Sequence, residues 1–275
     1  MKNARLSMAI GFVLVLALAL LFIAPLGVLI MNSFKPLDEI MGDPLAWPNE
    51  WKFGNYSNAW TLLDIPNVVK NTAILSFGAV ALIVLLASMT AYWSERQPTP
   101  VSRIFGRLIL LSILIPFATI MLPLVQVMRF LHLNNTLGGA ILTYAGIGLA
   151  FAYFLIRSGV KSLPYELEEA AQIDGSGQVR LFFQIVLPLL APTIFSVFVM
   201  DMFWVWNDFL IPMILLNNES LSTVQLAVNR LFGMYSSRWD VAMPALTMSM
   251  LPIIIIFVLL QRKIVGGVMA GAVKG

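Results

Sequence analysis

The chain has 275 residues, of which 59% are apolar and only 11% are charged, whereas a soluble domain carries about 25% charged residues. Too few polar side chains are present to cover a water-soluble fold, so the composition predicts a lipid bilayer as the solvent. The absence of cysteine excludes disulfides, thiolate metal sites and a cysteine nucleophile, and the net charge of +3 is too small to indicate nucleic-acid binding.

Apolar windows long enough to cross a bilayer recur along the chain. A helix needs about 20 residues to cross a hydrocarbon core of about 30 Å. We predict an all-α, polytopic membrane protein in which residues 1–275 form a single transmembrane domain. Its six transmembrane helices are predicted at about 8–31, 72–93, 108–128, 137–156, 189–213 and 243–261. The first window is too long for a signal-peptide core and lacks a small-residue cleavage site, so we interpret it as a retained anchor.

The basic residues are distributed unevenly between the two sides of these six helices. With the N-terminus inside, the inner segments contain 11 of the 17 basic residues and 5 acidic residues. The outer segments contain the other 6 basic residues and 7 acidic residues. Because Lys and Arg are enriched in cytoplasmic loops, this distribution predicts a multi-pass protein with both termini in the cytoplasm.

The hydrophilic stretch 157–188, between the fourth and fifth predicted spans, has the marks of a short helix. Pro164 is tolerated at a first helical position, three glutamates follow in the first turns, and Gly175 offers a left-handed end. We predict a cytoplasmic helix at about 164–174. Such a short helix is marginally stable alone, so it needs a partner to pack against.

The same stretch carries a spaced pattern of seven residues. It reads Glu-Ala-Ala, three residues, Gly, nine residues, then Ile-x-Leu-Pro. The matching positions are Glu169, Ala170, Ala171, Gly175, Ile185, Leu187 and Pro188. This pattern resembles the EAA loop of the permeases of binding-protein-dependent ABC importers.

The resemblance implies a role for each part of this loop. In that family the loop forms a coupling helix, which docks into a groove on a cytoplasmic ATPase subunit and transmits nucleotide-driven closure to the membrane helices. By this resemblance Glu169, Ala170 and Ala171 would seat the helix, Asp174 and Gly175 would end it, and Ile185, Leu187 and Pro188 would lead into the fifth span.

Three further segments resemble the carbohydrate-uptake branch of that family, and within it the second permease subunit of the maltose transporter. They are Asn32-Ser33-Phe34-Lys35 after the first span, Trp206-Asn207-Asp208-Phe209-Leu210 at the end of the fifth, and Gly271-Ala272-Val273-Lys274-Gly275 at the C-terminus. Related tails lie along the ATPase dimer. The resemblance implies a permease for a sugar or oligosaccharide, without naming the solute.

The resemblance also implies the partners of the chain. They are a homologous permease forming a heterodimer, two cytoplasmic ATPase subunits and an extracytoplasmic solute-binding protein, in a prokaryotic cell membrane. The chain contains no G-x-x-x-x-G-K-[ST] phosphate loop, so we expect ATP and Mg on the ATPase subunits and no cofactor, metal or catalysed reaction on this chain. The single histidine, His132, is interpreted as a loop residue.

A polar group near the end of the fifth span is a candidate for the substrate path. Asp201, Trp204 and Asp208 share a helical face, and Asn207 lies beside them. Carboxylates next to an aromatic plane suit a hydroxyl-rich ligand. Equally, Asp201 could be a structural residue bonded to a neighbouring helix, Trp204 an interface anchor, and Asn207 and Asp208 residues that cap or kink the helix.

Two other classes of membrane protein compete with the importer. A gradient-driven secondary transporter usually has internal repeats or several intramembrane ionisable residues, and here Asp201 and Asp208 are the candidates. An intramembrane enzyme would need a convergent catalytic set, but neither H-E-x-x-H nor G-x-S-x-G occurs. Copurification with an ATPase distinguishes the importer from both.

Overall fold

The computed structural model describes residues 2–232 and 238–272, and every regular element in these residues is a helix. The predicted all-α class is therefore confirmed for this part of the chain. By its internal contacts the chain divides into two compact units. The first consists of Met1–Asn67 and Ala227–Leu251, and the second of Val68–Leu226 and Pro252–Gly275.

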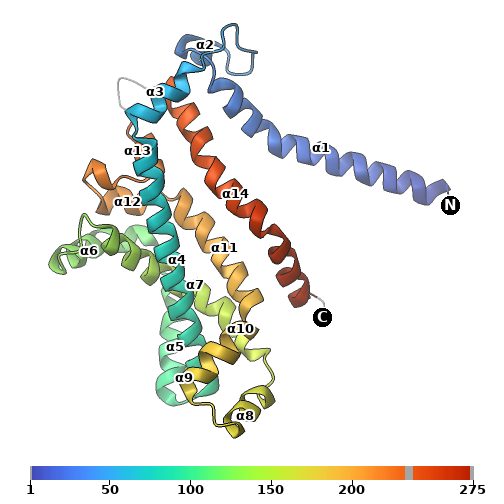
Figure 1. Ribbon diagram of the computed structural model, residues 1–275, viewed down its shortest axis with the longest axis vertical. Helices are drawn as coiled ribbons and strands as arrows, with labels where there is room; N and C mark the ends of the chain where they lie inside the picture. Colours follow the sequence, from blue (N-terminus) through green and yellow to red (C-terminus); the bar gives the residue numbers. More distant parts are fainter. Residues whose placement is uncertain (1, 233–237, 273–275) are drawn as a thin grey trace. The chain divides into compact units, whose positions relative to one another are not determined.

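The first unit contains α1 (Lys2–Asn32), α2 (Leu37–Gly42) and α3 (Gly54–Leu62) (Figure 1). The segment after α1 is held by hydrogen bonds from amide side chains. The Nδ2 group of Asn32 donates to the Pro44 carbonyl at 2.9 Å, and that of Asn55 donates to the Lys35 carbonyl at 2.8 Å. The Phe34 ring contacts the Tyr56 ring, with centroids 5.0 Å apart. The segment singled out at 32–35 is thus the turn that ends α1.

The second unit contains most of the remaining helices (Figure 1). In chain order they are α4 (Ile65–Arg96), α5 (Pro100–Ser112), α6 (Phe117–Phe130), α7 (Leu137–Lys161), α8 (Glu166–Ile173), α9 (Gln178–Leu181), a π-helix (Phe182–Val186), α10 (Leu187–Leu189), α11 (Ala191–Asn207), α12 (Leu210–Leu215) and a 3₁₀-helix (Glu219–Leu221). The helices α4, α13 (Val224–Asn229) and α14 (Trp239–Ala272) each run from one unit into the other.

Four helical segments are long and apolar enough to cross a membrane on their own. They are Ile10–Asn32, Ile65–Arg96, Leu137–Lys161 and Trp239–Val258. These segments coincide with the first, second, fourth and sixth predicted spans. Since several apolar helices are present, the chain is a multi-pass membrane protein.

The other two predicted spans are not single straight helices. The predicted third span, 108–128, contains the junction at which α5 and α6 meet at 111°. The predicted fifth span, 189–213, begins at the junction where the helical segments Gln178–Leu189 and Ala191–Asn207 meet at 74°. Pro116 precedes α6 and Pro192 opens α11, and proline disfavours a helical residue before it and lacks a donor N–H. The predicted fifth span also extends too far, to residue 213, because α11 ends at Asn207. The number of spans is six if each bent pair crosses once.

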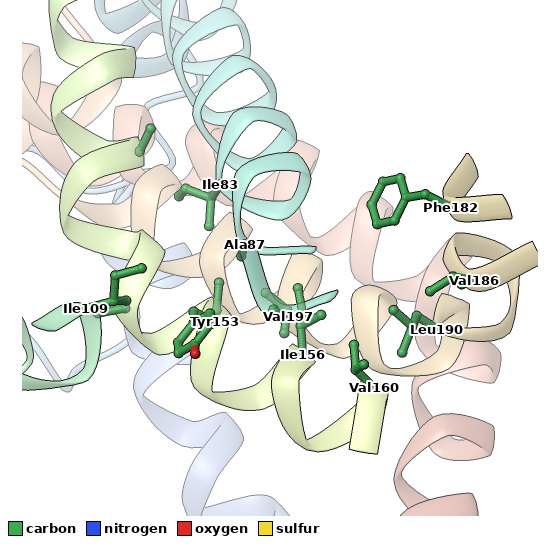
Figure 2. Packing of buried hydrophobic residues seen from close by; sticks show 14 of the residues in the cluster. Ile83, Ala87, Ile109, Tyr153, Ile156, Val160, Phe182, Val186, Leu190 and Val197 are labelled. Carbon is green, nitrogen blue, oxygen red and sulfur yellow. The ribbon is translucent and has the colours of Figure 1, made fainter. Parts of the chain in front are cut away.

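Small residues on α7 let its neighbours approach closely. In the second unit α7 packs against α5, α11 and α12. A Cβ at Gly148 would lie 2.7 Å from Ile83 Cδ1 of α4 and 3.1 Å from the Trp204 ring of α11, so a larger residue there would require these side chains to shift. Figure 2 shows residues of this core from several helices, among them Ile109 of α5, Tyr153 and Ile156 of α7 and Val197 of α11. Close packing through small residues is typical of helices in membranes.

Candidate functional site

Helix α8 is the centre of the candidate coupling site. It runs from Glu166 to Ile173, two residues later and one residue earlier than the bounds predicted at 164–174. Gly175 adopts a positive φ of 81°. The Gly175 N–H donates to the Gln172 carbonyl and the Ser176 N–H to the Ala171 carbonyl, both at 3.0 Å. This pair of bonds is the Schellman arrangement, which ends a helix with a left-handed glycine.

The two sides of α8 differ in exposure. Ala171 is 7% exposed and belongs to the hydrophobic core of the second unit. By contrast Glu169, Ala170, Asp174 and Gly175 are all exposed. The residues that the sequence grouped together are therefore split, with one alanine packed against the unit and the rest on a free surface.

The residue that fixes α8 to the unit is Glu168, which is only 2% exposed. Its Oε1 accepts a hydrogen bond from Arg96 Nε at 2.6 Å, and its Oε2 accepts one from the Tyr92 hydroxyl at 2.9 Å. A terminal nitrogen of Arg96 also donates to the Leu163 carbonyl at 3.0 Å. The Arg96 guanidinium lies 5.6 Å from the Tyr165 ring centroid. Through these bonds the C-terminal end of α4 holds both α8 and the turn before it.

Sequence reasoning missed this anchor. It counted Glu168 as one of three glutamates that favour a helix N-terminus, and Arg96 as one of the basic residues that set orientation. A signal was present, because Tyr92 and Arg96 are four residues apart and therefore share one face at the end of a span. Which glutamate they would meet depends on the rotation of α8, and the sequence does not specify that rotation.

A mixed polar and aromatic cavity of about 260 Å³ lies beside this ion pair. Its walls come from the end of α4, from α8 and from α9. The lining residues are Tyr92, Trp93, Arg96, Gln97, Tyr165, Glu168, Gln172 and Gln178. A polar group could therefore enter beside α8, although the Glu168 carboxylate is almost fully buried.

The segment between α8 and α11 is mostly helical but changes its helix type along its length. Ile185 lies in the π-helix, and Leu187 and Pro188 lie in α10. Leu187 and Pro188 also line an apolar groove of about 680 Å³, together with Phe77, Ala191, Ile194, Phe195, Phe198 and Ile256. The short helix is therefore connected to α11 through a π-helix, which is followed by a 74° bend.

The structure separates the four candidate residues of the substrate path. Asp201 is 3% exposed, and its Oδ2 has no hydrogen-bond partner in the described residues. Trp204 stands edge-on to Tyr144 of α7 with ring centroids 5.4 Å apart, so it packs between helices. Asn207 is exposed and donates to the Phe203 carbonyl at 2.8 Å.

Asp208 caps the next helix. It accepts a hydrogen bond from the Tyr144 hydroxyl at 2.6 Å, and its carboxylate also accepts from the N–H groups of Leu210 and Ile211 at 3.3 and 3.1 Å. These two N–H groups open α12 and lack intrahelical acceptors. Of the alternatives for Asp208, the capping role therefore matches its contacts.

Two further sequence observations concern ligands and the C-terminus. Within residues 2–232 and 238–272, no group of three His, Cys, Asp or Glu side chains lies close enough to hold a metal ion. In the C-terminal segment 271–275, residues 273–275 lie outside those that the structure describes.

Comparisons with known proteins identify a family and a fold. The family model for the inner membrane component of binding-protein-dependent transport systems matches residues 83–269. A crystal structure of a bacterial ABC transporter involved in the import of the acidic polysaccharide alginate contains a similar chain. The TM-score is 0.80 at 21% identity, and the match covers 95% of this chain and 98% of that one. At this identity the likeness shows the fold alone.

Curated relatives match over nearly the whole length. A probable permease for starch degradation products from Thermoanaerobacterium thermosulfurigenes is 35% identical over 94% of both chains. A diacetylchitobiose uptake permease from Streptomyces coelicolor is 32% identical over 97% of this chain and 89% of its own. A melibiose, raffinose and stachyose import permease from Bacillus subtilis is 30% identical over 100% of both.

Proposed function

Given that the chain belongs to the family of inner membrane components of binding-protein-dependent transport systems, we propose that it is the permease of an ATP-driven importer for a sugar or oligosaccharide. The family consists of transporter permeases rather than enzymes. The proposed solute class is supported by the relatives, since three of them are named for the uptake of oligosaccharides or starch products. An extracytoplasmic binding protein would deliver the solute.

In this proposal α8 is the coupling helix, and both chain termini lie in the cytoplasm. The division of α8 into a fixed and a free side carries the proposal. Glu168 is bonded to Arg96 and Tyr92 of α4, whereas Glu169 is exposed on the same helix. Apolar side chains are exposed beside it, with Ile173 at 86% and Val179 at 73%. Exposed apolar groups rimmed by charges are typical of protein contact surfaces.

The proposed route of coupling follows from these bonds. An ATPase subunit that pushes or pulls on the free side of α8 would move the end of α4 with it, because the two are joined by a buried ion pair and a hydrogen bond. Transmission to α11 would instead pass through the π-helix and the 74° bend. ATP and Mg would be bound by two separate ATPase subunits, and a homologous permease would complete a heterodimeric pathway.

We also propose that Asp201 contributes to the substrate path, together with the neighbouring Trp204, Asn207 and Asp208. An intramembrane carboxylate costs about 2.5–3.5 kcal/mol on insertion scales and usually marks a functional path or a bonded pair. The unbonded Oδ2 of Asp201 supports the path, since a second helix supplies no partner in the described residues. For Asp208 the capping bonds favour a supporting role, in which it caps the start of α12.

The main test is purification of the chain from its native membrane in mild detergent, with identification of every copurifying subunit by mass spectrometry. We expect an ATPase and a second permease, and reconstituted uptake of labelled oligosaccharides that requires ATP. A chain that purifies alone and transports without ATP would contradict the importer and favour a gradient-driven secondary transporter.

A charge reversal tests the coupling surface separately. Glu169→Lys should reduce ATPase copurification and uptake while leaving the amount of inserted protein unchanged, because the residue is exposed and its side chain has no bond to another described residue. The matched control is Asp38→Lys, an exposed carboxylate in the first turn of α2. Equal copurification with Glu169→Lys and with the control would place the ATPase contact elsewhere.

A further inference from the structure

A second polar cavity, of about 130 Å³, lies between the end of α4, the helix α5 and the second half of α7. It is separate from the cavity beside Glu168, since the two share no lining residue. Three of its seven lining residues are arginines and three carry hydroxyl groups. They are Ser94, Ser102, Arg103, Gly106, Arg107, Tyr153 and Arg157.

Positive charge around this cavity exceeds negative charge. Glu95 is the acidic neighbour, and its carboxylate is shared by Arg157 Nε at 2.7 Å and Lys161 Nζ at 4.0 Å. Arg103 makes one long bond, from Nε to the Thr99 carbonyl at 3.4 Å. Arg107 has no hydrogen bond or ion pair with any described residue. Several guanidinium N–H groups are therefore left to bind an anion, for which their fork geometry is suited.

Buried, hydrogen-bonded side chains form the floor of the cavity. The hydroxyls of Tyr153 and Ser94 are 2.9 Å apart, and both residues are buried. Gly106 of α5 lies over the Tyr153 hydroxyl, and a Cβ at this position would collide with it. The absence of a side chain at Gly106 thus brings α5, with Arg103 and Arg107 one turn apart, close against α7. The arginines are carried by packed helices rather than by a loop.

The rest of α5 indicates what kind of anion reaches this cavity. Beside the arginines, the helix exposes a row of large apolar side chains: Val101, Ile104, Phe105, Leu108 and Leu111. The Phe105 ring stands edge-on to Trp93, with centroids 5.9 Å apart. Tryptophan is enriched where a span reaches the headgroups. A ligand lying here would meet arginines at one end and an exposed apolar surface at the other.

We propose that this cavity binds the phosphate group of an anionic phospholipid, with Arg103, Arg107 and Arg157 around the phosphate and the acyl chains along the apolar side chains of α5. The cavity is large enough for a phosphate, and basic pockets between membrane helices are known to hold lipid headgroups. The site does not depend on the proposed solute. It would tie α5 and α7 to the annular lipid.

The test uses the full chain with its copurifying subunits, stripped of lipid in detergent. Phosphatidylglycerol and phosphatidylcholine with identical acyl chains are added together, and bound lipids are counted by native mass spectrometry. We expect selective retention of phosphatidylglycerol. The double variant Arg103→Gln/Arg107→Gln should bind it about 30-fold more weakly, since each basic residue near anionic lipid contributes about 1 kcal/mol. Arg129→Gln, an exposed arginine on α6, is the matched control and should bind normally.

Two additional arms can overturn the proposal. The double variant Arg103→Lys/Arg107→Lys keeps the positive charge but loses the planar, forked donors of the guanidinium group. Its affinity for phosphatidylglycerol should therefore lie between those of the wild type and the glutamine variant. Wild-type binding by this lysine variant would indicate diffuse attraction and no built site. Complete displacement of phosphatidylglycerol by inorganic phosphate would identify a free phosphate as the ligand. Equal retention of both lipids, or equal loss in Arg129→Gln, would exclude a specific site for anionic lipid at this cavity.

Discussion

Two buried carboxylates in the second unit have opposite environments. Glu168 and Asp201 are 2% and 3% exposed. Both oxygens of Glu168 accept hydrogen bonds, one from the charged Arg96 and one from Tyr92. For Asp201, Oδ2 has no partner in the described residues. A desolvated charge costs several kcal/mol unless bonds compensate it. Glu168 has this compensation and holds α8 in place, whereas Asp201 lacks it at Oδ2.

Hydrogen bonding distinguishes a structural carboxylate from a functional one here, whereas burial is nearly the same for both residues. A compensated carboxylate can be explained by the structure it stabilises, and its removal leaves the mostly covered Arg96 without an ionic partner. An uncompensated carboxylate has no structural explanation among the described residues, so a role in transport becomes the stronger interpretation. The outcome for each residue can be measured as a change in stability.

The largest effect is expected for Glu168→Ala. Arg96, whose side chain is only 14% exposed, loses its ionic partner, which should reduce the free energy of unfolding by about 3 kcal/mol. Thermal unfolding of the detergent-purified chain measures this loss. Glu169→Ala is the matched control, and it should change stability by less than about 0.5 kcal/mol because the residue is exposed. An unchanged unfolding temperature for Glu168→Ala would show that the ion pair does not hold α8.

An intermediate effect is expected for Asp208→Ala, at about 2 kcal/mol. The Tyr144 hydroxyl and the two N–H groups that open α12 all lose their acceptor. The adjacent Asn207→Ala removes one exposed bond to the Phe203 carbonyl and should cost little. Similar losses in the two variants would mean that the capping bonds of Asp208 contribute nothing specific.

The smallest effect on stability is expected for Asp201→Asn. The substitution removes a charge that lacks full compensation, so the free energy of unfolding should stay the same or rise by about 1 kcal/mol. Solute affinity should change if the carboxylate lines the path. A fall in stability of more than about 1 kcal/mol, with normal uptake, would instead return Asp201 to a structural role and remove the contrast with Glu168.

The sequence predicted the elements better than their connections. Four of the predicted spans coincide with single long helices, because about 20 consecutive apolar residues have few other solutions in a bilayer. Windows of apolar composition cannot detect a bend: the predicted third span contains the bend between α5 and α6, and the predicted fifth span begins at the bend before α11. Pro116 and Pro192 were visible in those windows, but proline is common enough in membrane helices that it does not specify an angle of 111° or 74°.

In the loop at 157–188 the sequence likewise predicted the local elements but not the contacts of single side chains. The sequence alone predicted the short helix, its left-handed end at Gly175 and the family of the chain, because these features depend on the local spacing of residues. Tertiary structure alone decided that Glu168 is the anchor and Glu169 is exposed, that Asp208 caps α12, and that three arginines line one cavity with Tyr153. Each of these depends on how a helix is rotated against its neighbour, and that rotation is set by packing across the whole unit, including close approaches such as the one at Gly148.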